Sequence, residues 1–231
     1  MRRSTGWYRP VKRLVDVAVG LVAALPALVG VGALSLAALI SHGRPVFFRQ
    51  VRVGRHGRHF TLVKLRTMRT AAAEAAQAGD LGSPGLGSTM VVGRAFAEQA
   101  RITRFGGFLR RTHLDELPQL LHVLRGDMAL VGPRPLAPDH VAEVVASRRS
   151  TVRPGFTCYA QLELVEHGYL DKHRQIALDE EYVDRLGPAT DAAILWRTVT
   201  VVARGPSRRP PLAHYDPAGA GWPTDRLPTG Q

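Results

Sequence analysis

The sequence is poor in cysteine, and it lacks the common glycine motifs of nucleotide-binding folds. Cys158 is the single cysteine in 231 residues, so no intrachain disulfide can form and nothing requires an oxidising compartment. Neither a GxxxxGK[ST] loop nor a GxGxxG fingerprint occurs, which excludes the usual phosphate cradles. The length suffices for one buried core, so we expect one main domain that faces the cytosol.

Acidic residues are scarce as well. The chain has 19 Asp and Glu against 31 Lys and Arg, a formal net charge of +12. This surplus favours polyanionic partners: nucleic acid, anionic lipid or phosphorylated small molecules. Aromatic residues make up only 6% of the chain and no recognised nucleic-acid-binding module occurs. We therefore expect no nucleic acid partner, although a basic polyanion-binding membrane protein stays open as an alternative.

Charge is almost absent from Leu14 to Ile40, where Asp16 is the one ionisable residue. A helix of this length would reach roughly 40 Å, more than the ~30 Å hydrocarbon core of a bilayer. A soluble core helix would show a polar face, and a signal peptide would be shorter and end in a cleavage site. The pattern predicts a membrane segment over residues 14–40, preceded by a basic flank over 1–13.

Basic residues lie on both sides of this segment, at Arg9–Arg13 and Arg44–Arg55. Such residues prefer the cytoplasmic side of a membrane, and a straight spanning helix cannot place both flanks there. Pro26 near the middle can bend or break a helix. We therefore predict a re-entrant helical hairpin with both ends cytoplasmic and Asp16 near the interface. A plain spanning helix with a proline kink stays open.

The remainder, residues 41–205, predicts a cytoplasmic domain. Alternation around Gly54–Gly57 indicates a β-hairpin with strands near 46–52 and 59–65. Residues 101–111 mix arginine with phenylalanine and leucine, which is typical of an amphipathic element on an anionic surface; a solvated basic turn is the alternative.

Three further segments complete the chain. Residues 70–93 are alanine-rich and then Gly/Ser/Pro-rich, which predicts a short helix and a loop. Residues 176–204 predict two helices around Gly187, and the proline-rich tail over 206–231 is expected to be disordered. The expected fold is α+β and mostly helical, with a membrane hairpin, a small β-hairpin and interfacial helices around a central helix.

That central helix follows two adjacent carboxylates, Asp115 and Glu116. Leucines recur at helical spacing from 114 to 124, and Thr112 could cap the helix with Asp115 three residues later. The first turn would then place both carboxylates at the positive end of the helix dipole. This stabilises either residue structurally, and we expect it to keep Asp115 ionised as a nucleophile.

Several basic residues could bind phosphate. Arg134 and Arg153 each stand next to proline, in GPRP and VRPG. A rigid backbone fixes the guanidinium, which suits phosphate geometry. Together with Lys64 and Arg66 they indicate a phosphate site, whereas surface ion pairs are the alternative.

The ordered motifs KRLVDVAVG, PVFFRQVRVG, KLRTM, TRFGGFLRRTHLDELPQLLHVLRGDMALVGPRP and VRPGFT resemble those of the bacterial sugar transferases, the monotopic polyprenyl-phosphate phosphoglycosyltransferases. The resemblance runs from Lys12 to about Gly205. It implies an inner-membrane enzyme whose catalytic domain, residues 41–205, faces the cytoplasm.

The resemblance also implies a reaction. The residue matched by Asp115 attacks the sugar-linked phosphate of a UDP-sugar, UMP leaves, and polyprenyl phosphate, expected to be undecaprenyl phosphate, takes the phosphosugar from the aspartyl intermediate. The product would begin an exopolysaccharide, capsule or other glycoconjugate. Glu116 matches a residue that helps to hold Mg²⁺, and the positions expected to bind substrate or phosphate are Lys64, Arg66, Arg111, Arg134, Arg153, Gln161 and Asp179.

The chain departs from the family pattern at three places. The family usually has Ser-Pro at the membrane break, where this chain has Leu28-Val29. It commonly has Asp-Pro before the arginine matched by Arg101, where this chain has Gln99-Ala100. After Arg-Pro-Gly it tends toward Thr-Gly and a downstream Val-Asn-Gly, where this chain has Thr157-Cys158 and LELVEHG.

These departures bear on topology and on sugar or nucleotide recognition. The sugar, the polymer and any homodimer therefore stay open, and a catalytically inactive membrane scaffold is the other alternative.

Overall fold

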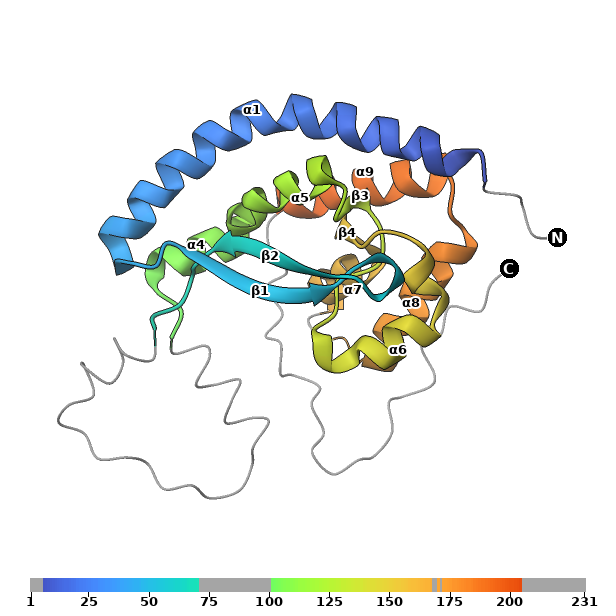
Figure 1. Ribbon diagram of the computed structural model, residues 1–231. Coiled ribbons are helices and arrows are strands. Elements are labelled where there is room, and N and C mark those ends of the chain that lie inside the picture. Colours follow the sequence, from blue (N-terminus) through green and yellow to red (C-terminus); the bar gives the residue numbers. More distant parts are fainter. Residues whose placement is uncertain (1–5, 71–100, 168–169, 171, 205–231) are drawn as a thin grey trace, which may run out of the picture.

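The computed structural model describes residues 6–70, 101–167, 170 and 172–204. The predictions for residues 71–93 and for the tail at 206–231 lie outside these residues. The described part is mostly helical, with two small two-stranded sheets (Figure 1). The predicted α+β class is therefore confirmed.

The apolar segment forms one long helix, α1 (Tyr8–His42). Figure 1 shows it as a single curved helix, with its concave side toward the β-hairpin and α5. The structure differs here from the predicted hairpin of two helices, because the helix continues through Pro26. A proline inside a helix removes one backbone hydrogen bond and bends the axis without necessarily breaking it.

The outer side of α1 carries exposed apolar side chains. Val22, Leu25 and Val29 expose 80%, 71% and 71% of their surface, and the helix is long and apolar enough to cross a bilayer. Exposed apolar surface of this size on a helix is stable only in a membrane or against a partner. The helix and the exposed side chains together indicate membrane association.

Both ends of α1 are attached to the same domain. At the start, the Tyr8 hydroxyl donates to Asp191 Oδ2 at 2.7 Å, and Lys12 Nζ approaches the same atom at 2.6 Å. At the end, the Arg66 guanidinium donates to the carbonyls of His42 and Gly43 at 2.6 and 2.7 Å. A charged donor on the last carbonyls of a helix caps it.

Asp16, which the sequence predicts near the membrane interface, lies in this docked region. Its side chain is buried and accepts a hydrogen bond from the Leu130 amide at 3.2 Å. A buried carboxylate needs such partners, and Lys12 Nζ lies 3.5 Å away. Asp16 therefore joins α1 to the domain.

The predicted β-hairpin is confirmed as β1 (Phe47–Val53) and β2 (His59–Leu65), joined by the short helix η1 (Arg55–Gly57). The strands are antiparallel, and Phe48 pairs with Lys64. Because side chains alternate along a strand, Lys64 shares a face with Phe48 and Arg52.

The region of the acidic pair is broken into three elements, α4 (Arg104–Thr112), η2 (Leu114–Gln119) and α5 (Leu120–Arg125). His113, with a left-handed φ of 56°, separates the first two. The predicted cap at Thr112 is wrong: this residue ends α4, and its hydroxyl donates to the Phe108 carbonyl. Thr103 caps α4 instead, by accepting from the Gly106 amide.

The remaining elements complete the domain beneath these helices. Strands β3 (Ala129–Val131) and β4 (Gly155–Thr157) pair in parallel. The helices are η3 (Pro138–His140), α6 (Val141–Ala146), η4 (Arg148–Thr151), α7 (Tyr159–His167), α8 (Lys172–Asp184) and α9 (Pro188–Arg204). The two helices predicted within 176–204 are confirmed. The main core joins Leu62, Val123, Met128, Tyr182 and Ile194.

Candidate functional site

The acidic pair occupies the first turn of η2. Asp115 is only 6% exposed, whereas Glu116 is half-buried. Consecutive residues of a 3₁₀ helix point about 120° apart, since one turn takes three residues. The two carboxylates therefore face different surroundings although they are neighbours in the chain.

Burial dominates the electrostatics of Asp115. Burial, the largest cause, and the negative charge of Glu116 together raise the pKa of this carboxyl to about 6. The cations of Lys64 and Arg110 act in the opposite direction. The expected stabilisation by the helix dipole is therefore outweighed, because η2 is short and the side chain is removed from water. Most of the Asp115 population is still ionised at neutral pH.

Two cations come to the acidic pair from different elements. Lys64 projects from β2, and its Nζ lies 5.3 Å from the centre of the Phe48 ring. Burial lowers the pKa of Lys64, and the charge of Asp115 counteracts this shift. The second cation is Arg110 of α4, whose Nε donates to Thr67 Oγ1 at 2.8 Å.

Gly106 makes the position of Arg110 possible. A Cβ atom at this glycine would lie 2.0 Å from the Thr67 carbonyl oxygen. Only glycine permits so close an approach of backbone to backbone. Gly106 therefore allows α4 to pack against the segment that follows β2.

Arg52 and Arg134 extend the group of cations. Burial and the neighbouring charge of Arg134 lower the pKa of Arg52, and Arg52 in turn acts on Lys64. Arg52 donates to Gln50 Oε1 at 2.7 Å, but its buried Nε has no hydrogen-bond partner among the described residues. Buried donors normally find acceptors, so an anion fits beside this guanidinium.

Asp179 positions Arg134. One of its oxygens accepts from the Arg134 amide at 3.1 Å, and the other lies 2.9 Å from Arg149 Nη2. Arg149 also donates to the Arg134 carbonyl. Burial raises the pKa of Asp179 to about 6, while the Arg149 charge opposes the shift. The predicted residue Asp179 thus holds the backbone of the GPRP loop.

Gln161 joins the site through Glu116. Its Nε2 lies 3.5 Å from Glu116 Oε2, a long hydrogen bond. The backbone N–H of Gln161 donates to the sulfur of the buried Cys158 at 3.3 Å. The predicted residues Asp115, Glu116, Lys64, Arg134, Gln161 and Asp179 therefore belong to one neighbourhood.

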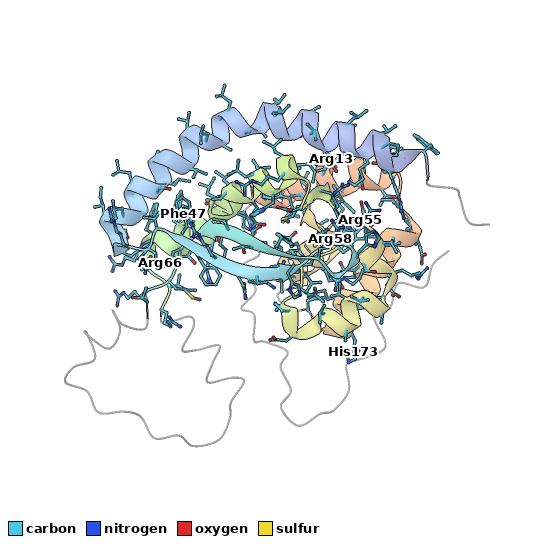
Figure 2. All side chains as sticks on the ribbon, in the orientation of Figure 1. Arg13, Phe47, Arg55, Arg58, Arg66 and His173 are labelled. Atoms are coloured by element: carbon cyan, nitrogen blue, oxygen red, sulfur yellow. The ribbon has the colours of Figure 1, made fainter. Side chains whose placement is uncertain are left out.

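Three predicted arginines lie elsewhere. Arg66 is buried and donates to four backbone carbonyls around the end of α1, where Figure 2 also shows it. Arg153 donates to the Gly126 carbonyl and lies near Arg13 and Arg55. Arg111 is exposed on α4. The structure therefore gives Arg66 a structural role, and neither Arg153 nor Arg111 is among the charges that act on Asp115.

Sequence reasoning missed Arg52 and Arg110. A signal for Arg52 was present, because hairpin register places it on the face of Lys64. Nothing in the sequence distinguishes Arg110 from Arg111. The break in the helix at His113 decides how each of these side chains is directed relative to η2.

The acidic pair also fits a magnesium ion. Mg²⁺ usually takes one or two protein carboxylates, and substrate phosphates and water complete its shell. Among the described residues, no group of three His, Cys, Asp or Glu side chains could hold a metal ion by itself. Coordination by one or two carboxylates together with substrate phosphates is therefore the mode that these residues allow. A cation would also relieve the repulsion that raises the pKa of Asp115.

The chain resembles known proteins over most of its length. The family model described as bacterial sugar transferase matches residues 7–205. An uncharacterized sugar transferase, EpsL of Bacillus subtilis, is 35% identical over 162 residues, which cover 69% of this chain and 71% of EpsL.

Two other relatives are named UDP-glucose:undecaprenyl-phosphate glucose-1-phosphate transferase. The Escherichia coli protein is 32% identical over 203 residues, or 84% of this chain, and the Caulobacter vibrioides protein is 44% identical over 109 residues, or 43% of this chain. The matched part spans 40% of each of these relatives. The chain therefore belongs to the bacterial sugar transferase family.

Proposed function

We propose that this protein transfers a sugar-1-phosphate from a UDP-sugar to polyprenyl phosphate and releases UMP. The observation that carries the proposal is the buried carboxylate of Asp115 between the cations Lys64 and Arg110. The two relatives named as glucose-1-phosphate transferases acting on undecaprenyl phosphate support the reaction class. A Salmonella typhimurium relative named undecaprenyl-phosphate galactose phosphotransferase supports it as well.

The first step forms a covalent intermediate. An Asp115 oxygen attacks the phosphorus that carries the sugar, and the bond from this phosphorus to the bridging oxygen of the diphosphate breaks. UMP leaves with the electron pair of that bond. A carboxylate is a competent nucleophile at phosphorus, and Lys64, Arg110, Arg52 and Arg134 are suited to bind the anionic oxygens.

The second step regenerates the enzyme. An oxygen of polyprenyl phosphate attacks the same phosphorus, the bond to Asp115 breaks, and the carboxylate is released. The product is polyprenyl-diphosphate-sugar. The half-buried Glu116 would hold Mg²⁺ with the phosphate oxygens, and the ion supplies charge neutralisation of the diphosphate. Gln161, in contact with Glu116, would orient that carboxylate.

The attachment of α1 supports a re-entrant placement. A helix whose two ends bind one domain, through Asp191 and Arg66, keeps both ends on one side of a bilayer. The basic flanks favour the cytoplasmic side. We therefore place the domain on the cytoplasmic face of the inner membrane, where soluble UDP-sugar and lipid-borne phosphate can both reach it.

The proposal is tested by UMP release. Purified protein in lipid nanodiscs is given Mg²⁺, undecaprenyl phosphate and a panel of UDP-sugars, with Asp115→Asn as the control. UMP from one donor, absent in the variant, supports the reaction and identifies the sugar. UMP release that persists in Asp115→Asn removes Asp115 as the nucleophile. Folded protein that releases no UMP with any donor favours the inactive scaffold.

A further inference from the structure

Three arginines that the proposed reaction does not use gather beneath the start of α1. Arg13 belongs to α1, Arg55 to η1, and Arg153 to the loop before β4. We call these three residues the arginine cluster. Figure 2 shows Arg13 and Arg55 on the same side of the domain, under the N-terminal half of α1. None of the three is among the charges that act on Asp115, so the cluster is separate from the catalytic carboxylates.

The guanidinium groups of Arg13 and Arg153 meet at Gly126, which follows α5 with a φ of 93°. A Cβ atom at this glycine would lie 3.3 Å from Arg13 Nη2 and 3.9 Å from Arg153 Nε. Arg13 donates to the carbonyls of Val123 and Leu124 at 2.5 and 2.9 Å. Arg153 Nε donates to the Gly126 carbonyl at 2.7 Å. The backbone at the end of α5 therefore holds both cations in place, close to each other.

Arg55 adds a third cation with unused donors. Its Nε donates to the Thr151 carbonyl at 3.1 Å, whereas a guanidinium has five N–H donors in all. Within the described part of the chain, the Nη atoms of Arg55 and Arg153 have no acceptor. Both side chains are only half-buried. These Nη atoms are therefore available to an acceptor from outside the protein.

The positive charge of the cluster is poorly compensated. Burial, the largest cause, and the charges of Arg13 and Arg55 lower the pKa of Arg153. Asp16 opposes this shift, but Lys12 already lies beside its carboxylate. No carboxylate of the described residues forms an ion pair with any member of the cluster. Like charges held this close repel one another, and a bound anion would remove the repulsion.

The cluster lies near the beginning of the membrane helix. Arg13 directly precedes Leu14, which is 71% exposed, and Trp7 before the start of α1 is 62% exposed. Tryptophan is enriched where a bilayer meets water, which is the level of the lipid phosphates. Long basic side chains next to an apolar helix reach the same level. The cluster is therefore placed where it can meet lipid headgroups as well as phosphate in solution.

From these observations, we propose that the arginine cluster is a second phosphate-binding site of this protein. Its ligand is a phosphate monoester or diester, which accepts hydrogen bonds from the Nη atoms of Arg55 and Arg153. An anionic phospholipid headgroup and free phosphate share this chemistry. The bound phosphate bridges α1, η1 and the loop before β4, so it strengthens the attachment of α1 to the domain. The inference does not depend on the proposed function.

A matched pair of substitutions tests the inference. Arg55→Gln removes one cation of the cluster, whereas Arg9→Gln removes an exposed cation one turn before Arg13 on α1. Each protein is placed in phosphatidylcholine nanodiscs. One series receives increasing fractions of phosphatidylglycerol, and the other receives increasing inorganic phosphate at constant ionic strength. Tm is measured at each step, and each variant is compared with itself in plain phosphatidylcholine, so that a general loss of stability cancels.

We expect the Tm of the wild-type protein to rise in at least one series, because a ligand that binds only the folded state stabilises it. The series that responds identifies the source of the phosphate. Arg55→Gln should raise the ligand level for half of the increase about tenfold, the effect of one lost charged hydrogen bond. Arg9→Gln should stay within about twofold of wild type, since a single exposed charge contributes little.

Three outcomes would overturn the inference. A wild-type Tm that responds in neither series shows that no phosphate binds. A half-maximal level that Arg55→Gln leaves unchanged places the phosphate elsewhere, such as beside Lys64 and Arg134. Equal changes in Arg55→Gln and Arg9→Gln indicate general attraction to anions and no defined site.

A second variant decides the matter if Arg55→Gln does not fold. Arg55→Lys keeps the charge but loses the planar fork of the guanidinium, so it should raise the half-maximal level about threefold. A level equal to that of wild type would then refute the site.

Discussion

Replacing Asp115 by asparagine should abolish activity and stabilise the protein at the same time. The pKa of Asp115 rises from its ordinary value of 3.8 to about 6, first through burial and then through the charge of Glu116. A shift of roughly two units corresponds to about 3 kcal/mol by which the ionised carboxylate destabilises the folded state at pH 7. Asparagine has nearly the same shape and carries no charge, so it removes this cost.

The stability that Asp115→Asn gains over the wild-type protein should depend on pH. The folded state retains a proton on Asp115 that the unfolded state has lost between pH 3.8 and about 6. The wild-type protein therefore loses stability as pH rises through this window, and the cost is complete above pH 6. The advantage of Asp115→Asn should be largest above pH 6 and should vanish as pH falls toward 4.

Thermal unfolding in detergent, without Mg²⁺ and between pH 5 and pH 8, measures the effect. Each kcal/mol should shift Tm by about 2–4 °C in a domain of this size, while kcat for UMP release should fall by at least about 10³-fold. Asp184→Asn, at a half-exposed carboxylate paired with Arg148, is the control and should not raise Tm. A Tm for Asp115→Asn at or below that of wild type at pH 7.5, or an increase that does not vary with pH, would refute the reasoning.

Two further predictions separate catalytic from structural arginines. Arg110→Gln should lower kcat/KM for UMP release by about 10²-fold, since a preorganised cation next to Asp115 is lost; its exposed neighbour Arg111→Gln should stay within about twofold, and equal losses in both variants would contradict the assignment. Arg66→Gln should lower the unfolding free energy by about 3 kcal/mol, because four carbonyls lose a charged donor. Chemical denaturation measures this loss, and an Arg66→Gln protein of normal stability with a raised KM for UDP-sugar would restore Arg66 to the phosphate site.

The sequence predicted the elements that depend on local patterning. Alternation and the Gly54–Gly57 turn predicted the ends of both hairpin strands to within one residue. The uncharged run predicted the membrane helix, and the motif around Asp115 and Glu116 placed the carboxylates. Each of these features depends on the pattern of consecutive residues, so one stretch of the chain is enough to predict it.

The tertiary structure decided which cations serve the carboxylates. Arg66 and Arg153 have the same chemistry as Arg52 and Arg110, but Arg66 caps α1 and Arg153 binds the Gly126 carbonyl. Local sequence cannot distinguish them, because a guanidinium binds a phosphate or a carbonyl according to what the fold brings within 3 Å.

The same holds for Asp115 and for α1. The sequence by itself determined an adjacent carboxylate pair at a helix start, in which it predicts Asp115 as the nucleophile, and an apolar helix with basic flanks. Only the folded structure decided that burial outweighs the dipole at Asp115 and that α1 continues through Pro26 in a curve. Desolvation and docking depend on what packs around a residue, and those neighbours can be distant in the sequence. Lys64 acts on Asp115 in this way, and Asp191 binds Lys12.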